Sequence, residues 1–302
     1  MGENMVTITA GEMKRRGGRL RLSGNVTTLS PRDAERIASE IEEVELVAPF
    51  EEKRMNAKFD NNAAETTITG STLDFQFIRG YRIENGEMFS ERDLKTANRV
   101  AIIGKTAIKN LFGEEDPIGQ VVKVHFIPFK IIGVFEAKGV DTNGLDQDDL
   151  IFIPLPTLMR RIVNQTHVSR IFVKISSREN IEKASEKIRE LLRESHKLTD
   201  DREDDFTLVS QLDLEDMKRE TSELFTKLIV GVAAISLLVG GIGILAVMLI
   251  SVKERTKELG IRKAIGATPS SIIGMIIQEA IFITTISGYV GLLVGIGILK
   301  LT

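Results

Sequence analysis

The pattern of hydrophobic and polar positions divides the chain into a mixed first part and an apolar tail. Residues 228–252 form an uninterrupted run of 25 uncharged residues between Lys227 and Lys253. A helix rises about 1.5 Å per residue, so a helix of this length would cross a hydrocarbon core of about 30 Å. A second long helix is predicted after Pro269, because proline is favoured in the first helical turn. The tail therefore predicts two transmembrane helices, at residues 228–252 and 272–301.

The distribution of charge predicts how these helices are oriented. The loop at residues 253–271 carries five basic and two acidic side chains, whereas residues 213–227 carry three basic and five acidic ones. The positive-inside rule then places the loop in the cytoplasm and residues 1–227 outside the cell membrane. Residues 1–30 show no pattern typical of a signal peptide or a spanning helix, so we expect a chain that is truncated or split at its start.

Glycines recur within both predicted membrane helices. Gly240, Gly241 and Gly243 lie in the first helix, and the second contains the spacing Gly291-x-x-x-Gly295. Small residues at this spacing let two helices approach closely in a membrane. We expect these five glycines to serve helix packing, although glycine is also simply common in membrane helices.

The first 210 residues alternate between strand-like and helix-like patterns, which predicts an α+β domain. Two β-α-β units, at residues 5–50 and 170–210, are separated by a β-rich insert at about residues 60–168. The helix of the first unit is predicted to begin at the capping box Ser30-x-x-Asp33, with Pro31 in its first turn. The domain is therefore expected to be a duplicated β-α-β unit split by an inserted subdomain.

Local patterns define the other expected elements of this domain. The helix of the second unit is predicted to begin at Ser176-x-x-Glu179 and to bury an apolar face. A polar loop is predicted around Gly17 and Gly18. The residues of the apolar face are Ile181, Ala184, Ile188, Leu191 and Leu192. The predicted strands are 5–9, 44–50, 65–79, 98–103, 120–126, 130–136, 171–175 and 206–210, with helical or turn segments at 90–95 and 105–112.

Residues 211–227 form an amphipathic segment that joins the domain to the first membrane helix. No Gly or Pro interrupts the sequence between this segment and residue 228. A single helix from about residue 211 to 252 would be roughly 60 Å long. Such a stalk could transmit force between the outside domain and the cytoplasmic loop, and the alternative is a passive connection.

The composition argues against several classes of function. The chain has no Cys, which excludes disulfide scaffolds, cysteine nucleophiles and thiolate metal sites. Its three histidines, His125, His167 and His196, show no metal-ligand spacing. The segment that ends in Gly104-Lys105-Thr106 lacks the first glycine of a phosphate-binding loop, because position 99 is Arg. We expect no catalytic, cofactor or metal site in this chain, no enzymatic activity and no nucleic-acid partner.

The loop after the first membrane helix carries the most specific motif. Residues 251–267 read SVKERTKELGIRKAIGA and resemble the signature of the FtsX/MacB superfamily of ABC-transporter permeases. Residues 235–244 and Gln278-Glu279-Ala280 are similar to neighbouring parts of the same family. In the first part of the chain, residues 86–89, 111–119, 131–134 and 153–154 resemble a MacB-type periplasmic domain.

This resemblance implies an architecture and a set of partners. Family members have four membrane helices, with a large outside domain between the first and second, and this chain would lack the first and the last. The outside domain would consist of a porter-like part split by a sabre-like insert. The expected partners are an ABC ATP-binding subunit that binds ATP and Mg, a second permease copy, membrane lipid, and an outer adaptor or membrane-fusion protein.

The cytoplasmic loop is expected to couple the permease to its ATPase. Its charged side chains would dock on a polar groove of the partner. Its apolar side chains would anchor it, and its glycines would permit a close approach or a turn. The charged residues are Glu254, Arg255, Lys257, Glu258 and Arg262, the apolar ones are Leu259, Ile261 and Ile265, and the glycines are Gly260 and Gly266. A generic positive-inside loop would explain the basic residues but not the interleaved Glu, Gly and Ile.

The function expected from these features is that of a permease subunit. ATP hydrolysis by the partner would drive movement of the outside domain and the export or extraction of a substrate. One alternative is an FtsX-like membrane adaptor that controls an extracytoplasmic enzyme, and another is a non-functional permease fragment. The sequence does not specify the substrate.

Overall fold

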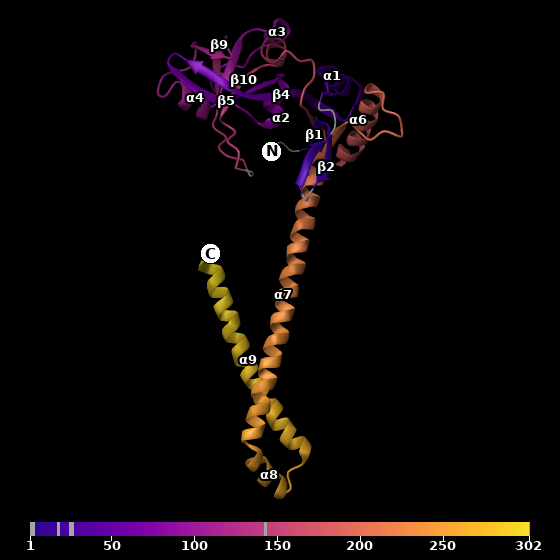
Figure 1. Cartoon of the computed structure of the whole chain (residues 1–302), viewed down its shortest axis with the longest axis vertical. Coiled ribbons are helices and arrows are strands. Elements are labelled where there is room, and N and C mark those ends of the chain that lie inside the picture. The colour runs from indigo at the N-terminus through magenta and orange to yellow at the C-terminus, as the bar shows by residue number, and fades with distance from the viewer. Residues whose placement is uncertain (1–3, 17–18, 24–26, 142–143, 302) are drawn as a thin grey trace. The chain divides into compact units, whose positions relative to one another are not determined.

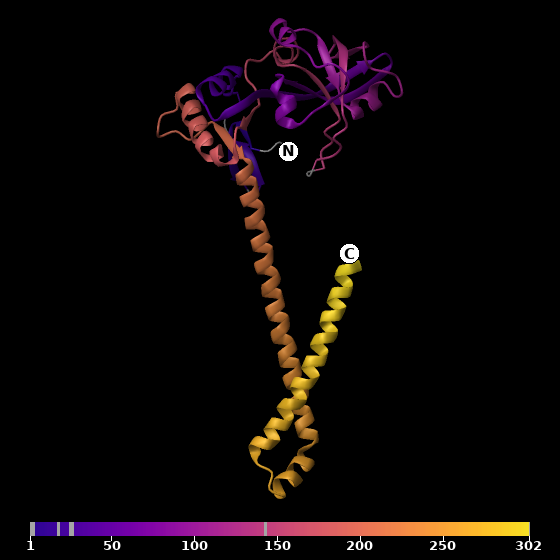
Figure 2. The same cartoon turned by 180° about the vertical axis from the view of Figure 1, so that it is seen from behind.

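The computed structural model describes residues 4–16, 19–23, 27–141 and 144–301. The chain divides into two compact units, Met1–Met217 and Lys218–Thr302. Figure 1 labels the elements of each unit, and Figure 2 shows the same elements from behind. The first unit is a mixed α+β domain and the second is helical, so the coarse fold class agrees with the sequence prediction.

A ten-stranded mixed sheet forms the frame of the first unit. Its strand order is β12-β1-β11-β4-β5-β10-β7-β9-β6, and β8 pairs with both β4 and β9. The strands are β1 (Met5–Ala10), β4 (Val44–Phe59), β5 (Asn62–Ser71), β6 (Ile83–Gly86), β7 (Val100–Ile103), β8 (Val121–Val124), β9 (Ile127–Phe135), β10 (Leu150–Pro154), β11 (Arg170–Ile175) and β12 (Phe206–Ser210). A separate hairpin consists of β2 (Glu12–Arg16) and β3 (Arg19–Ser23). The loop predicted around Gly17 and Gly18 lies outside the described residues.

Short helices connect these strands. They are α1 (Pro31–Glu40), α2 (Asp74–Arg79), α3 (Glu91–Thr96), α4 (Lys105–Leu111), α5 (Leu155–Thr157) and α6 (Ile181–Ser195). A π-helical turn spans Leu158–Val163, and a 3-10 turn spans Arg178–Asn180.

Strand β4 joins two parts of the sheet. Its residues up to Phe50 pair with β11, and its residues from Glu51 onwards pair with β5. The prediction separated the two parts near residue 60, whereas the change of pairing partner falls at Phe50–Glu51 within one continuous strand. The strand predicted at 44–50 is therefore the first half of a longer element.

Distinct apolar cores lie on either side of this change. Helices α1 and α6 pack through Ile37 and Ile188 into a core that includes Val6, Ile8 and Val173 of β1 and β11. The rest of the sheet has its own core with α4, which contains Ala57, Ile68, Val122, Phe129 and Ile151. A third cluster is rich in aromatic rings, among them Phe50, Phe75, Phe152 and Phe172.

The capping box of α1 forms as expected from the sequence. The Ser30 backbone N–H donates to Asp33 Oδ2 at 2.8 Å, and Pro31 occupies the first turn. The start predicted for the second long helix is wrong. A 3-10 turn precedes α6, and Asn180 rather than Ser176 stands at its N-cap. The five predicted apolar residues of α6 are buried.

The strand predicted at 65–79 is wrong beyond residue 71. Residues 74–79 form helix α2, which buries Phe75 and Ile78 on one face three positions apart. Gly80 ends this helix with a left-handed φ of 65°, a conformation that glycine adopts without strain. Burial of these two side chains in the aromatic cluster therefore favours the helix over an extended strand.

The second unit contains the long apolar helices. Helix α7 spans Gln211–Glu254 without interruption, α8 spans Thr256–Ala264 and α9 spans Pro269–Leu301. The segments Thr221–Glu254 and Pro269–Gly297 are long and apolar enough to cross a membrane, with mean hydropathies of 2.6 and 1.9. None of the residues in the most apolar stretch of either segment is buried, and Leu237, for example, is 79% exposed.

We predict that Gly86→Ala destabilises the domain more than Gly119→Ala. Both glycines have a φ near 80°, where a Cβ costs about 1–2 kcal/mol. At Gly86 an added Cβ would also lie 2.2 Å from the Ile132 carbonyl oxygen, whereas at Gly119 it would meet open space. Denaturant unfolding followed by circular dichroism measures the free energy of unfolding of each variant. An equal decrease in both variants would contradict the close contact between β6 and β9 at Gly86.

Candidate functional site

The candidate site lies between the two apolar helices. Helix α7 ends at Glu254, and Arg255 alone separates it from α8. The Thr256 hydroxyl donates to the Lys253 carbonyl at 2.7 Å, and the Leu259 N–H donates to the Arg255 carbonyl at 3.0 Å. These bonds satisfy the carbonyl groups of Lys253 and Arg255 where α7 ends, and α8 begins directly after Arg255.

Glycine sets the end of α8. Gly266 has a φ of 100°, and the Ala267 N–H donates to the Arg262 carbonyl at 3.0 Å across it. This is the bonding pattern of a helix that ends on a left-handed residue. Gly266 therefore stands at a turn, which is the role proposed for it from the sequence. Gly260 lies within α8, and a Cβ there would meet open space.

A polar contact joins the start of α8 to α9. Arg255 Nη1 lies 3.3 Å from Glu279 Oε2, and both side chains remain about half exposed. Arg262 also contacts α9, through the sulfur of Met275 at 2.8 Å. The sequence placed Glu279 in a family-like motif but did not pair it with Arg255, because no local pattern links residues on two different helices.

These residues line a hollow of about 380 Å³ between α8 and α9. Four charged and three apolar side chains contribute to it, with Gln278 as the one uncharged polar side chain. Its lining consists of Arg255, Glu258, Leu259, Arg262, Met275, Gln278, Glu279 and Phe282. Four of the ten proposed coupling residues thus face a common hollow with α9.

The six other proposed coupling residues are exposed, and Glu258, although it lines the hollow, is exposed as well. Ile261 and Ile265 are 64% and 81% exposed, an unusual position for large apolar side chains. Lys257 and Glu258 are exposed and, within the part of the chain that the structure describes, have no ion-pair partner. Glu254 is exposed at the end of α7. This segment therefore presents free charges and apolar side chains together on a short helix.

The glycines proposed for helix packing lie beside open space in the part of the chain that the structure describes. A Cβ added at Gly240, Gly241, Gly243, Gly291 or Gly295 would meet nothing within 4 Å. Their packing role stays a prediction. Among the described residues, no group of three or more His, Asp or Glu side chains could hold a metal ion.

The described chain is thus a sheet domain followed by two long apolar helices with a short exposed helix between them. Residues 1–191 match the family model of the MacB-like periplasmic core domain, and residues 230–302 match the FtsX-like permease C-terminal model. The chain belongs to the family of permeases with a MacB-like periplasmic core domain, which confirms the resemblance seen in the sequence.

Curated relatives extend this match over the whole chain. The chain is 34% identical to the macrolide export ATP-binding/permease protein MacB of Wolinella succinogenes, over 99% of this chain and 45% of the relative. It is 35% identical to the protein of the same name from Marinobacter nauticus, over 98% of this chain and 44% of the relative. The chain thus spans about half the length of these relatives.

Solved structures show the same fold for the first unit. The periplasmic region of MacB from Actinobacillus actinomycetemcomitans is similar with a TM-score of 0.60 and 24% identity, covering 74% of this chain and 94% of that one. The extracellular domain of the noncanonic ABC-type transporter YknZ from Gram-positive bacteria is similar with a TM-score of 0.56 and 18% identity, covering 68% and 100%.

We predict that Arg255→Glu loosens α8 and that the swap Arg255→Glu with Glu279→Arg restores it. An exposed ion pair contributes about 0.2–1 kcal/mol, so amide protection of residues 256–264 should fall by up to about fivefold in the single variant. Hydrogen exchange on the chain in detergent measures this change. Glu258→Arg serves as the control, because Glu258 has no ion-pair partner among the described residues. A double swap that fails to recover protection would refute the contact between Arg255 and Glu279.

Proposed function

We propose that the chain is the permease part of an ABC transporter of the MacB/FtsX type. In this proposal α7 and α9 cross the cell membrane, residues 1–227 lie outside, and the segment 253–271 faces the cytoplasm. The basic loop and the acidic flank support this orientation through the positive-inside rule. The family models for the two parts of the chain support the class.

The observation that carries the proposal is the exposed helix α8. A short helix with unpaired charges and exposed Ile side chains is suited to dock in a groove of another protein. Lys257 and Glu258 would pair with charges of an ATP-binding partner, and Ile261 and Ile265 would enter its apolar surface. Arg255 would link this docked helix to α9 through Glu279.

ATP and Mg belong to the partner in this proposal. Closing of two ATPase subunits would move α8, and α7 would carry that motion along its continuous backbone to β12 of the outside domain. This mechanotransmission would drive export or extraction of a substrate on the outer side without passage through the membrane. The macrolide export proteins among the relatives favour export over FtsX-like regulation of an enzyme.

The exposed glycines favour a dimer of permeases. Gly291 and Gly295 lie one turn apart on α9, where a second helix could approach closely. We propose that a second copy of this chain, or a related permease, covers this face. An outer adaptor or membrane-fusion protein would then meet the outside domains.

We predict that Glu258→Lys lowers ATP hydrolysis stimulated by the permease at least tenfold. Reversal of a charge at a docking helix sets like charges against each other, and a tenfold effect corresponds to about 1.4 kcal/mol. The assay uses the ATPase that copurifies with the permease, reconstituted with it in vesicles. Glu182→Lys, an exposed reversal on α6, is the matched control. Unchanged stimulation by Glu258→Lys would sink the docking assignment.

A further inference from the structure

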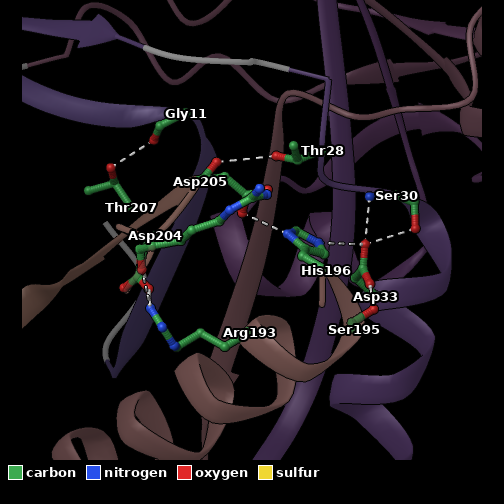
Figure 3. Close-up of polar contacts among 11 residues, drawn as sticks. Gly11, Thr28, Ser30, Asp33, Arg193, Ser195, His196, Asp204, Asp205 and Thr207 are labelled. Carbon is green, nitrogen blue, oxygen red and sulfur yellow. Dashed lines mark hydrogen bonds and ion pairs between the residues drawn. The ribbon is translucent and has the colours of Figure 1, made fainter. Parts of the chain in front are cut away.

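A histidine is buried between two carboxylates at the end of α6. The side chain of His196 is 8% exposed, and its Nδ1 lies 2.7 Å from Asp205 Oδ1. Its Nε2 lies 3.5 Å from Asp33 Oδ2, an ion-pair distance that is longer than a good hydrogen bond. Figure 3 shows the ring lying between the two acids. The ring of Phe206 lies nearly perpendicular to the imidazole, with the two ring centroids 5.9 Å apart.

Asp33 is fixed in place by other donors. Its Oδ2 accepts the backbone N–H and the hydroxyl of Ser30, both at 2.8 Å, and its Oδ1 accepts the Ser195 hydroxyl at 2.6 Å. Burial alone would raise the pKa of Asp33, but the nearby His196 ring and the hydrogen bonds from Ser195 and Ser30 outweigh it and lower this pKa well below the ordinary value. The carboxylate therefore stays charged beside His196.

The geometry favours the doubly protonated ring. A neutral imidazole has one N–H and one lone pair, so with carboxylates at both nitrogens one lone pair would face a negative charge. The imidazolium donates toward both acids instead. Burial opposes the charge on His196, but the contacts with Asp33 and Asp205 outweigh burial and raise its pKa above 6.5.

The contact at Asp205 holds the chain that enters β12. The Asp205 carbonyl accepts the Gly11 N–H at 2.8 Å and the Thr28 hydroxyl at 3.2 Å. The Thr207 hydroxyl donates back to the Gly11 carbonyl at 2.9 Å. Strand β12 ends at Ser210, and α7 begins at the next residue. His196 thus ties the entry of β12 to the first turn of α1.

The neighbouring charges do not respond in the same pH range. Arg193 binds Asp204 and donates to the Thr199 carbonyl at 2.9 Å, and Arg189 lies 3.4 Å from Asp204. A guanidinium stays protonated at all physiological pH values. This anchor therefore holds Thr199 and Asp204 whatever the pH, whereas the link between His196, Asp33 and Asp205 depends on protonation of the imidazole.

We propose that His196 is a pH-responsive clamp that fastens the start of β12 to α1 when protonated and releases it as the pH rises. A raised folded pKa means that the stabilisation is complete below about pH 6.5 and is lost as the pH rises through the folded value. The clamp would regulate how firmly the outside domain holds the strand that leads into α7. That the clamp senses the external pH rests on the proposed function, which places this domain outside the membrane. The titration of His196 itself does not depend on that proposal.

Hydrogen exchange of the full chain in detergent between pH 6 and 9 tests the clamp. After correction for intrinsic rates, we expect protection in residues 196–210 to fall about fivefold above pH 6.5, since a hydrogen bond from a charged donor is roughly twice as strong as a neutral one. His196→Gln should be poorly protected already at pH 6 and show no slope. His167→Gln should keep the wild-type slope.

A flat wild-type profile, or the same slope in His196→Gln, would overturn the clamp. Because that variant could fail to fold, the wild-type chain offers a second test. Its three histidines permit selective isotope labelling, and the imidazole of His196 should titrate above 6.5 by NMR. Titration below 6.5 would overturn the proposal. Neither experiment uses ATP or the ATPase, so their failure would leave the proposed function standing.

Discussion

The hydrocarbon core of a bilayer offers no hydrogen-bonding partner to a peptide group, and much of this chain follows from that constraint. A segment that crosses it must satisfy its own backbone, which only a helix or a closed barrel can do. Helix α7 meets this requirement over 44 residues, from the end of β12 to the segment before α8. The outside domain and the candidate coupling helix are consequently joined by one continuous hydrogen-bonded backbone.

The sheet domain is joined to that helix through its edge strand β12. Strand β12 lies at one end of the sheet order, beside β1, and its entry is tied to α1 and α6 through Asp205 and His196. At the other end of α7, the contact between Arg255 and Glu279 links α8 to α9. A small polar contact therefore lies near each end of α7, at His196 before the helix and at Arg255 after it. A change of charge or of partner could open either contact.

The sequence predicted those parts of the structure that local periodicity encodes. The uncharged run in α7, the capping box at Ser30 and the buried face of α6 each depend on residues within a few turns of one another. The helix at 74–79 was missed because its two buried side chains belong to an aromatic cluster formed by distant strands. The Arg255 contact and the His196 cluster join residues far apart in the sequence, and spacing along the chain carries no signal for them.

The central claim is that α7 transmits motion, and a helix break tests it most directly. Thr221–Leu224 would be replaced by four glycines, each costing about 1 kcal/mol of helix stability, or by four alanines that preserve the helix. The measurement is the ATP-dependent change in amide exchange of residues 27–210 in the complex reconstituted with its ATPase. We expect the glycine variant to hydrolyse ATP without this change and the alanine variant to retain it. An undiminished change in the glycine variant would contradict transmission through α7.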